Sequence, residues 1–242
     1  MARPTVLFFS DVHLASDRPE RCERLVRFLE GPAREAGEIV CLGDLFDVWL
    51  GPEHVRVPDY KPALRALGEL VASGVPVAFV HGNRDFHVGK ELERELGVRV
   101  VRDRVELSMD GIRIYGCHGD LLCTGDRRYQ IYRRIVRSGP ARAVARAVPF
   151  PVAYRVAQGM RAASRREIAA KTQAEMSIAN GALESLVRAG WDAIVCGHVH
   201  REGTLDVRSG ARVGRVYTLG DWDAKGRYLA YENGRFEFRE VS

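Results

Sequence analysis

Short apolar runs alternate with helical patterns over residues 1–120 of the chain. The runs at 6–9, 39–42 and 75–80 are rich in β-branched and aromatic residues, which favour strands. The segment 59–74, between two of them, repeats apolar residues at helical spacing and ends on a glycine. An order of strand, helix and strand predicts a mainly parallel sheet whose strands are joined by crossover helices. The predicted fold class is therefore α/β.

The second half of the chain has a different pattern. Residues 127–189 look largely helical, a strand is predicted at 193–196, and the tail 204–238 alternates in strand fashion. We expect one domain over residues 1–242, with a helical insertion at about 125–172. Three dipeptides are predicted to form turns between strands: Asp110-Gly111, Ser209-Gly210 and Asn233-Gly234.

The cysteines and the N-terminus bear on the cellular compartment. The five cysteines are an odd number and form no CxxC pair, which argues against a disulfide framework and against a zinc ribbon. Cys41 and Cys196 lie within apolar runs, where we expect them to be buried. The N-terminal run at 6–9 is too short for a signal peptide, and no run approaches the roughly 18 apolar residues of a transmembrane helix. We therefore expect the chain in the cytoplasm.

Positive charge is concentrated in one segment. Residues 127–171 hold twelve lysines or arginines and one acid, Glu167, a charge of +11 in a chain whose net charge is +5. The rest of the chain therefore carries −6. This segment suits an anionic partner such as phosphate, nucleic acid or an acidic membrane surface, but a solvated helical face would carry the same charge.

Polar residues able to bind a metal follow five of the apolar runs. In an α/β sheet, side chains at the carboxyl ends of the strands lie along one edge, where ligands bind. Residues two apart, such as Asp11 with His13, share a face if the backbone is extended, and the same holds for His198 with His200. The five groups are Asp11-Val12-His13, Gly43-Asp44-Leu45-Phe46-Asp47, Gly82-Asn83-Arg84-Asp85, His118-Gly119-Asp120 and Gly197-His198-Val199-His200.

The five groups taken together favour a metal site. Each alone reads equally well as a cap, a turn or a packed histidine, but four of the seven histidines fall at these strand ends. The set offers carboxylates, imidazoles and one amide without a thiolate, a mixture that suits Mn²⁺, Fe²⁺ or Zn²⁺ in a hydrolytic site. Seven ligands are too many for one open catalytic ion and fit two ions that share a carboxylate. The candidates are Asp11, His13, Asp44, Asn83, His118, His198 and His200.

The motifs DVH, GDLFD, GNRD, HGD and GHVH, in this order, resemble those of the calcineurin-like metallophosphoesterase superfamily. The resemblance implies a four-layer α/β/β/α sandwich. It implies one metal held by Asp11, His13, Asp44 and His200 and a second held by Asp44, Asn83, His118 and His198, with Asp44 bridging. The catalytic residues that it implies are Asp44, Asn83, Arg84 and His118.

Arg84 points to one family within this superfamily. Many superfamily phosphatases carry a histidine here that can protonate a leaving group, whereas an arginine binds phosphate oxygens with its planar fork. The stretches LGDLFDVWLG, HGNRDFHVGK and CHGDLLCTGDRRYQIYRR resemble the UDP-2,3-diacylglucosamine hydrolases of lipid A biosynthesis, from about Leu7 to Trp222. That family implies a Mn²⁺-dependent pyrophosphate hydrolase, in which a metal-activated water attacks the α-phosphate of UDP-2,3-diacylglucosamine. The products would be UMP and 2,3-diacylglucosamine 1-phosphate, known as lipid X.

The same resemblance implies a set of substrate contacts. Gly125 stands where the family often has an aspartate, and Ile168 stands where it has a substrate-binding asparagine. The apolar residues and arginines of the insertion suit a lid over acyl chains and anionic headgroups, so we expect peripheral association with the cytoplasmic face of the inner membrane. Asp85 is expected to support a histidine ligand or Arg84. The substrate-binding positions are Asn83, Arg84, Asp126, Ser164, Lys171 and His198.

Two other functions fit parts of the sequence. A phosphodiesterase or nuclease would use the same metal core, with the basic segment along a nucleic-acid backbone. That segment has few aromatic residues for base stacking, and Arg84 departs from the histidine common in those branches. A non-catalytic binding module would need a broken ligand set, whereas every ligand position is filled. We therefore expect a lipid-linked nucleotide sugar as partner, no nucleic acid and no obligate protein partner.

Overall fold

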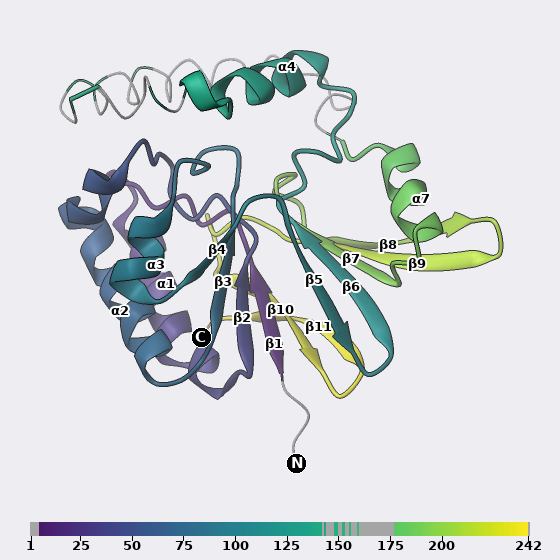
Figure 1. Ribbon diagram of the computed structural model, residues 1–242. Helices are drawn as coiled ribbons and strands as arrows, with labels where there is room; N and C mark the ends of the chain where they lie inside the picture. Colours follow the sequence, from purple (N-terminus) through teal and green to yellow (C-terminus); the bar gives the residue numbers. More distant parts are fainter. Residues whose placement is uncertain are drawn as a thin grey trace.

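Two β-sheets lie face to face at the centre of the protein (Figure 1). The computed structural model describes residues 5–141, 143, 148–149, 152, 155, 159 and 177–241. The first sheet has the order β11-β10-β1-β2-β3-β4; β1 to β4 are parallel, and β10 pairs antiparallel with both β1 and β11. Its strands are β1 (Val6–Phe9), β2 (Glu38–Cys41), β3 (Val77–Val80), β4 (Arg99–Val101), β10 (Arg227–Glu232) and β11 (Arg235–Glu240).

The second sheet has the order β5-β6-β7-β9-β8. Its inner strands β6, β7 and β9 are parallel, while β5 and β8 pair antiparallel with their neighbours. Asp110 and Gly111 join β5 to β6 with φ angles of 51° and 79°, the left-handed geometry that a tight hairpin needs, as predicted. The strands are β5 (Arg104–Met109), β6 (Ile112–Cys117), β7 (Ala193–Cys196), β8 (Gly203–Ser209) and β9 (Arg212–Thr218).

Helices cover the outer faces of both sheets (Figure 1). The helices α1 (Pro19–Glu30), α2 (Lys61–Ala72) and α3 (Lys90–Leu96) pack on the first sheet, and α7 (Asn180–Arg188) packs on the second. A further helix, α4 (Arg127–Val136), lies across the ends of the strands. None of the described helices is both long enough and apolar enough to cross a membrane. The described residues also form three short 3-10 helices: η1 (Pro32–Glu35), η2 (Pro52–Arg56) and η3 (Pro58–Tyr60).

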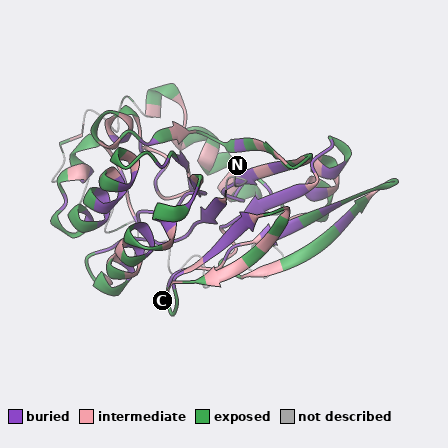
Figure 2. Ribbon diagram, turned by 90° about the horizontal axis from the view of Figure 1, so that it is seen from below, coloured by how far each residue is buried: buried purple, intermediate pink, exposed green. Residues whose placement is uncertain are grey.

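Three apolar cores separate the four layers, which confirms the α/β/β/α sandwich. In β1, Leu7 and Phe9 pack toward the helices, while Val6 and Phe8 pack toward the second sheet. A strand that is buried on both faces reads as a continuous apolar run, which is why β1 is recognisable in the sequence. The third core lies between the second sheet and α7. Figure 2 shows the central strands buried, whereas strands at the edges of the sheets, such as β8, and the outer faces of the helices are largely exposed.

The described residues settle some sequence predictions and leave others open. All five cysteines are free, and Cys41 and Cys196 are buried, as predicted. Most of the predicted insertion at 125–172 lies outside the described residues, so both the insertion and the single-domain organisation of 1–242 stay predictions.

Candidate metal centre

The loops that follow β1, β2, β3, β6 and β7 meet at one end of the two sheets. The sequence analysis predicted such an edge, but the structure builds it from two sheets: three strand ends come from the first and two from the second. Contacts between the loops bring together eight predicted site residues: Asp11, His13, Asp44, Asn83, Arg84, His118, His198 and His200.

The backbone of these loops differs from the expected one. Candidate ligands two residues apart share a face if the backbone is extended, and this condition is not met at Asp11 and His13 or at His198 and His200. Left-handed backbone at a non-glycine residue costs about 1–3 kcal/mol and persists only where the surrounding structure determines it. Tight turns rather than strand alternation therefore aim these side chains at one point. Five candidates have φ angles between 51° and 71°: Asp11, His13, Asp44, His198 and His200.

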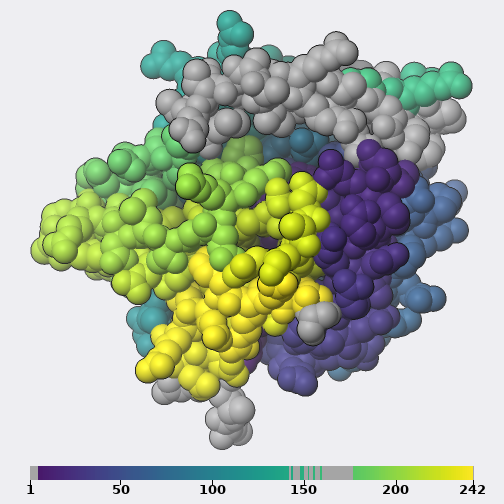
Figure 3. Space-filling view, turned by 180° about the vertical axis from the view of Figure 1, so that it is seen from behind, coloured from purple at the N-terminus to yellow at the C-terminus, as the bar shows by residue number. Residues whose placement is uncertain are grey.

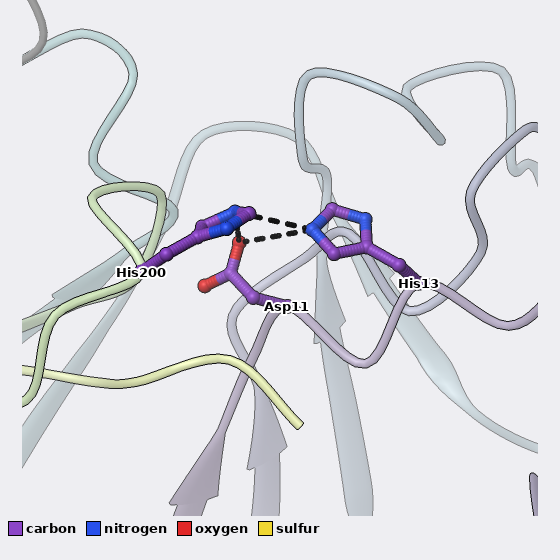
Figure 4. Close-up of side chains that lie close together, drawn as sticks. All are labelled: Asp11, His13 and His200. Atoms are coloured by element: carbon purple, nitrogen blue, oxygen red, sulfur yellow. Dashed lines mark hydrogen bonds and ion pairs between the residues drawn. The ribbon is translucent and has the colours of Figure 1, made fainter. Parts of the chain in front are cut away.

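The first group of candidate ligands is Asp11, His13 and His200, shown in Figure 4. The Nε2 atoms of the two histidines are 3.1 Å apart, and Asp11 Oδ1 lies 3.3 Å from His200 Nε2 and 3.8 Å from His13 Nε2. The other oxygen of Asp11 accepts hydrogen bonds from the Ser10 hydroxyl and from the His198 backbone N–H. Asp11 is fixed by these two bonds, so that its Oδ1 is left facing the two imidazoles.

The second group is Asn83, His118 and His198. Asn83 Oδ1 lies 2.8 Å from His118 Nε2 and 2.9 Å from His198 Nδ1, and those two nitrogens are 3.2 Å apart. His118 Nδ1 donates to the Leu42 carbonyl at 2.9 Å, which leaves Nε2 to face the group. A backbone carbonyl that fixes one ring nitrogen in this way is typical of metal-binding histidines.

Asp44 lies between the two groups. Its Oδ1 accepts from the Arg84 backbone N–H at 2.9 Å and lies 3.7 Å from His118 Nε2. Its Oδ2 lies 3.8 Å from His13 Nδ1. One oxygen of this buried carboxylate thus faces each group, which is the arrangement that a bridging ligand requires.

Three observations test whether these residues fit a divalent cation. Two pairs of imidazole nitrogens approach to 3.1 and 3.2 Å, so atoms with lone pairs converge on common points. Asp11 Oδ1 and His13 Nδ1 are buried and have no hydrogen-bond partner among the described residues. The donors are oxygen and nitrogen without a thiolate, as Mn²⁺, Fe²⁺ and Zn²⁺ accept in hydrolytic sites. The residues therefore fit a divalent metal.

Electrostatics in the site agree with this fit. Burial and the neighbouring His118 lower the pKa of His198 to about 4, so its imidazole is neutral and offers a lone pair at pH 7. Burial works against a charged His118, yet Asp44 and Asp11 outweigh it and raise the pKa of His118. The field at His118 thus favours positive charge.

Arg84 lies beside the bridging carboxylate. Its Nη1 donates to Asp47 Oδ1 at 2.9 Å, and its Nε is 3.7 Å from Asp44 Oδ2. The Arg84 side chain is 16% exposed, so the guanidinium is held in place but remains open to a ligand. Asp47, the last residue of the GDLFD motif, is thus the partner that holds Arg84. The sequence analysis gave Asp47 no role.

Asp85 has a different role from the expected one. It contacts neither a histidine ligand nor the Arg84 side chain through its hydrogen bonds, which come from the backbone N–H groups of Gly82, Asp44 and Phe46. Burial and the charge of Asp44 raise the pKa of Asp85 to about 7. Asp85 therefore joins the loop after β2 to the loop after β3.

The helix α4 is fastened over the site by polar contacts. Asp120 accepts from the Tyr129 hydroxyl at 2.6 Å and from Arg133 Nε at 2.8 Å, and Arg137 Nη2 donates to the Gly82 carbonyl at 2.7 Å. Asp120 belongs to the predicted HGD motif, but its role in binding α4 was not predicted. Asp126 caps α4 by accepting from the Tyr129 backbone N–H, so its predicted substrate contact stays a prediction. Ser164, Ile168 and Lys171 lie outside the described residues.

Binding of metal to this centre can be measured without substrate. A ligand at 100 times its dissociation constant stabilises the folded state by about 2.7 kcal/mol, which is about 5–10 °C in melting temperature for a domain of this size. We therefore expect saturating Mn²⁺ to raise the melting temperature by at least that amount relative to chelator, with matched ionic strength as the control. Equal melting temperatures in Mn²⁺ and in chelator would contradict the metal centre.

Comparison with known proteins agrees with the fold and the site. The chain belongs to the calcineurin-like phosphoesterases, whose family model matches residues 4–202. A crystal structure of a dimetal phosphatase from Danio rerio shares the fold, with a TM-score of 0.52 at 16% identity over 100% of this chain and 99% of that chain.

Within this class, the chain is similar over nearly its whole length to the UDP-2,3-diacylglucosamine hydrolases and shares their family. The hydrolase of Aeromonas salmonicida is 36% identical over 236 residues, which cover 95% of this chain and 91% of that protein. The hydrolase of Aeromonas hydrophila is 35% identical over 231 residues, which cover 95% of each.

Proposed function

We propose that this protein hydrolyses the diphosphate of UDP-2,3-diacylglucosamine to UMP and 2,3-diacylglucosamine 1-phosphate, a step of lipid A biosynthesis. The observation that carries the proposal is Arg84, a phosphate-binding fork held beside two converging groups of metal-binding side chains. Similarity at 35–36% identity to hydrolases named for this substrate supports the choice of substrate.

The proposal assigns two divalent cations, with Mn²⁺ as the expected ion. When bound, two such ions supply Lewis acidity, which activates a water and neutralises phosphate oxygens. Oxygen and imidazole donors support Mn²⁺ over a thiolate-preferring ion. The first ion would be held by Asp11, His13, Asp44 and His200, and the second by Asp44, Asn83, His118 and His198.

The chain's own groups orient the substrate. Arg84 presents a planar set of donors that suits two phosphate oxygens at once, and Asp47 fixes the direction of that fork. The Leu42 carbonyl holds His118 in the tautomer whose Nε2 faces the site. Asn83 contributes a neutral oxygen, so that a doubly charged diphosphate meets fewer negative groups. The proposed substrate contacts are Asn83, Arg84, Asp126, Ser164, Lys171 and His198.

The surface of α4 supports a lipid substrate. Ile131 and Ile135 are 59% and 61% exposed on this helix, and its sequence supplies several arginines. An exposed apolar pair among cations suits acyl chains and anionic headgroups. The proposal therefore includes peripheral association with the cytoplasmic face of the inner membrane.

The substrate assignment is tested with the purified protein and Mn²⁺. The assay compares kcat/KM on UDP-2,3-diacylglucosamine with that on a generic aryl phosphodiester and with the cleavage of single-stranded DNA. We expect the diphosphate to be preferred by several orders of magnitude. An intact diphosphate together with rapid cleavage of the phosphodiester or of DNA would point instead to a phosphodiesterase or nuclease on the same metal core.

The variant Arg84→Lys tests whether the planar guanidinium of Arg84 contributes more to phosphate binding than its positive charge alone. Lysine keeps the charge but loses the fork, and removing one preorganised donor to a reacting oxyanion costs about 10²–10³-fold in rate. We expect kcat/KM on the diphosphate to fall about 100-fold, on the same grounds. Arg94→Lys, at an exposed position of α3, is the control and should keep wild-type kinetics. An Arg84→Lys variant within threefold of wild type would remove the observation on which the proposal depends.

A further inference from the structure

Three arginines at the start of α1 make polar contacts outside the helix, and one of them contacts the loop that carries Asp11 and His13. Arg18, Arg21 and Arg24 recur at a spacing of three residues, so they lie on one face at the start of the helix. Positive charge is disfavoured at a helix N-terminus, where the macrodipole is itself positive. Their position therefore calls for partners outside the helix.

Arg21 has such partners, and it is buried, with 6% of its surface exposed. Its Nη1 donates to the Val12 carbonyl at 3.2 Å and to the His13 carbonyl at 3.1 Å. Its Nη2 donates to the carboxylate of Asp223. One guanidinium thus spans two consecutive carbonyls of the loop after β1 and a carboxylate from the far end of the chain.

Asp223 belongs to the connection between β9 and β10, which lies against the N-terminal part of the chain (Figure 3). Arg24 Nη1 donates to the carbonyls of Trp222 and Asp223 at 2.7 and 2.9 Å, so that α1 binds the backbone of this connection as well. Two residues earlier, Asp221 Oδ2 lies 3.6 Å from His200 Nδ1. The same connection is therefore fastened by Arg21 and lies next to His200.

The loop that Arg21 contacts needs this support. Asp11 and His13 both have left-handed backbone, with φ angles of 56° and 51°, which costs free energy at each residue. The carbonyls of Val12 and His13 point toward a buried side chain, and a buried carbonyl without a donor costs about 1–3 kcal/mol. Without Arg21, other backbone conformations of residues 11–13 would come close in free energy to the observed one.

We propose that Arg21, anchored by Asp223, is a positioning residue that holds the Asp11–His13 loop in the conformation that binds the first metal ion. The proposal rests on the metal centre proposed above. Arginine suits this place because its five donors, fixed in one plane, can reach two carbonyls and a carboxylate at once, whereas lysine is a point charge.

The test measures Mn²⁺ binding to the full-length, metal-free protein by titration calorimetry, with kinetics as a second readout. Residues that support metal ligands typically contribute 10–100-fold to metal affinity. For Arg21→Met we expect one of two Mn²⁺ sites to weaken 10–100-fold while the other changes little. We also expect kcat on the diphosphate to fall much more than KM rises, because Arg21 is buried and its Nη1 and Nη2 are hydrogen-bonded to the loop and to Asp223.

Two further variants make the test specific. Arg18→Met is the matched control, because Arg18 pairs with the same Asp223 carboxylate, whereas the hydrogen bonds to the Val12 and His13 carbonyls come from Arg21. It should bind both Mn²⁺ ions as wild type does. Asp223→Asn keeps Arg21 in the chain and is expected to weaken the same site by a smaller factor. The double variant Arg21→Met/Asp223→Asn should be no weaker than Arg21→Met alone, since the two residues act as a unit.

Several outcomes would overturn the proposal. Wild-type affinity at both sites in Arg21→Met would do so, as would equal losses in Arg18→Met and Arg21→Met. If Arg21→Met does not fold, Asp223→Asn decides, and unchanged affinities in that variant contradict the proposal. A wild-type protein that binds no Mn²⁺ would also overturn it. A wild-type protein that binds two Mn²⁺ ions but leaves the diphosphate intact would contradict the proposed substrate only, because the binding comparison is made without substrate.

Discussion

Asp44→Asn is expected to reduce kcat on the diphosphate by a factor of about 10³ or more, because the two proposed metal ions would lose their common ligand. Asp44 places its Oδ1 3.7 Å from His118 Nε2 and its Oδ2 3.8 Å from His13 Nδ1, so one carboxylate oxygen lies beside each group. An asparagine keeps the shape and one oxygen but removes the negative charge and the second oxygen. The variant is assayed at saturating Mn²⁺, alongside calorimetric titration of the metal.

The fold of this variant should be preserved. Burial, with the charge of Asp11 adding to it, raises the pKa of Asp44, so the carboxylate is costly in the metal-free protein. The asparagine can still accept the hydrogen bond from Arg84 N–H. We therefore expect a metal-free melting temperature equal to or above that of wild type. Asp110→Asn is a matched control, since Asp110 has nearly the same φ, 51° against 52°, in a hairpin turn between β5 and β6. Near-normal turnover by Asp44→Asn would rule out the two-metal account.

Gly82→Ala is expected to have the second largest effect. A Cβ atom at this position would lie 2.1 Å from Asp44 Oδ1 and 2.3 Å from Asp44 N, and much of that obstacle is backbone. The loops after β2 and β3 would have to separate, which also disturbs the bond from Gly82 N–H to Asp85. Overpacking of this kind costs about 1–3 kcal/mol or more, and a displacement of about 1 Å in a site can cost about 100-fold in rate.

Denaturant unfolding and turnover are both measured for this variant. Gly181→Ala is the control, because a Cβ there meets nothing within 4 Å in α7 and alanine favours a helix. The control should be as stable as wild type or slightly more stable. Wild-type stability and turnover in Gly82→Ala would mean that the loops after β2 and β3 are not held in the close contact described here.

The sequence predicted the fold well where the signals are local. β1 and β7 are buried on both faces, so each stands out as an apolar run and was placed at its observed residues. The C-terminal hairpin is different, because β10 pairs with β1 across more than 200 residues, as the pair Val6 and Tyr231 shows. Strand alternation marks such a hairpin but does not indicate which sheet it joins.

The candidate site was predicted by residue type and by its place at strand ends, but its local conformation was not. Left-handed backbone at Asp11 and His198 depends on contacts such as the bond from His198 N–H to Asp11 Oδ2, which joins residues far apart in the chain. The role of Asp85 likewise depends on a loop 41 positions away, to which it is hydrogen-bonded at Asp44. No short motif encodes such distant partners.

The proposed reaction is tested most directly by hydrolysis of UDP-2,3-diacylglucosamine in water enriched in oxygen-18, followed by mass spectrometry of both products. Attack on the α-phosphorus forms a bond between that phosphorus and the water oxygen and breaks the bond to the bridging oxygen, which leaves with the sugar phosphate. We predict one labelled oxygen in UMP and none in 2,3-diacylglucosamine 1-phosphate, with no products in the presence of chelator. Unreacted substrate, or label in the sugar phosphate, would contradict the proposed hydrolysis.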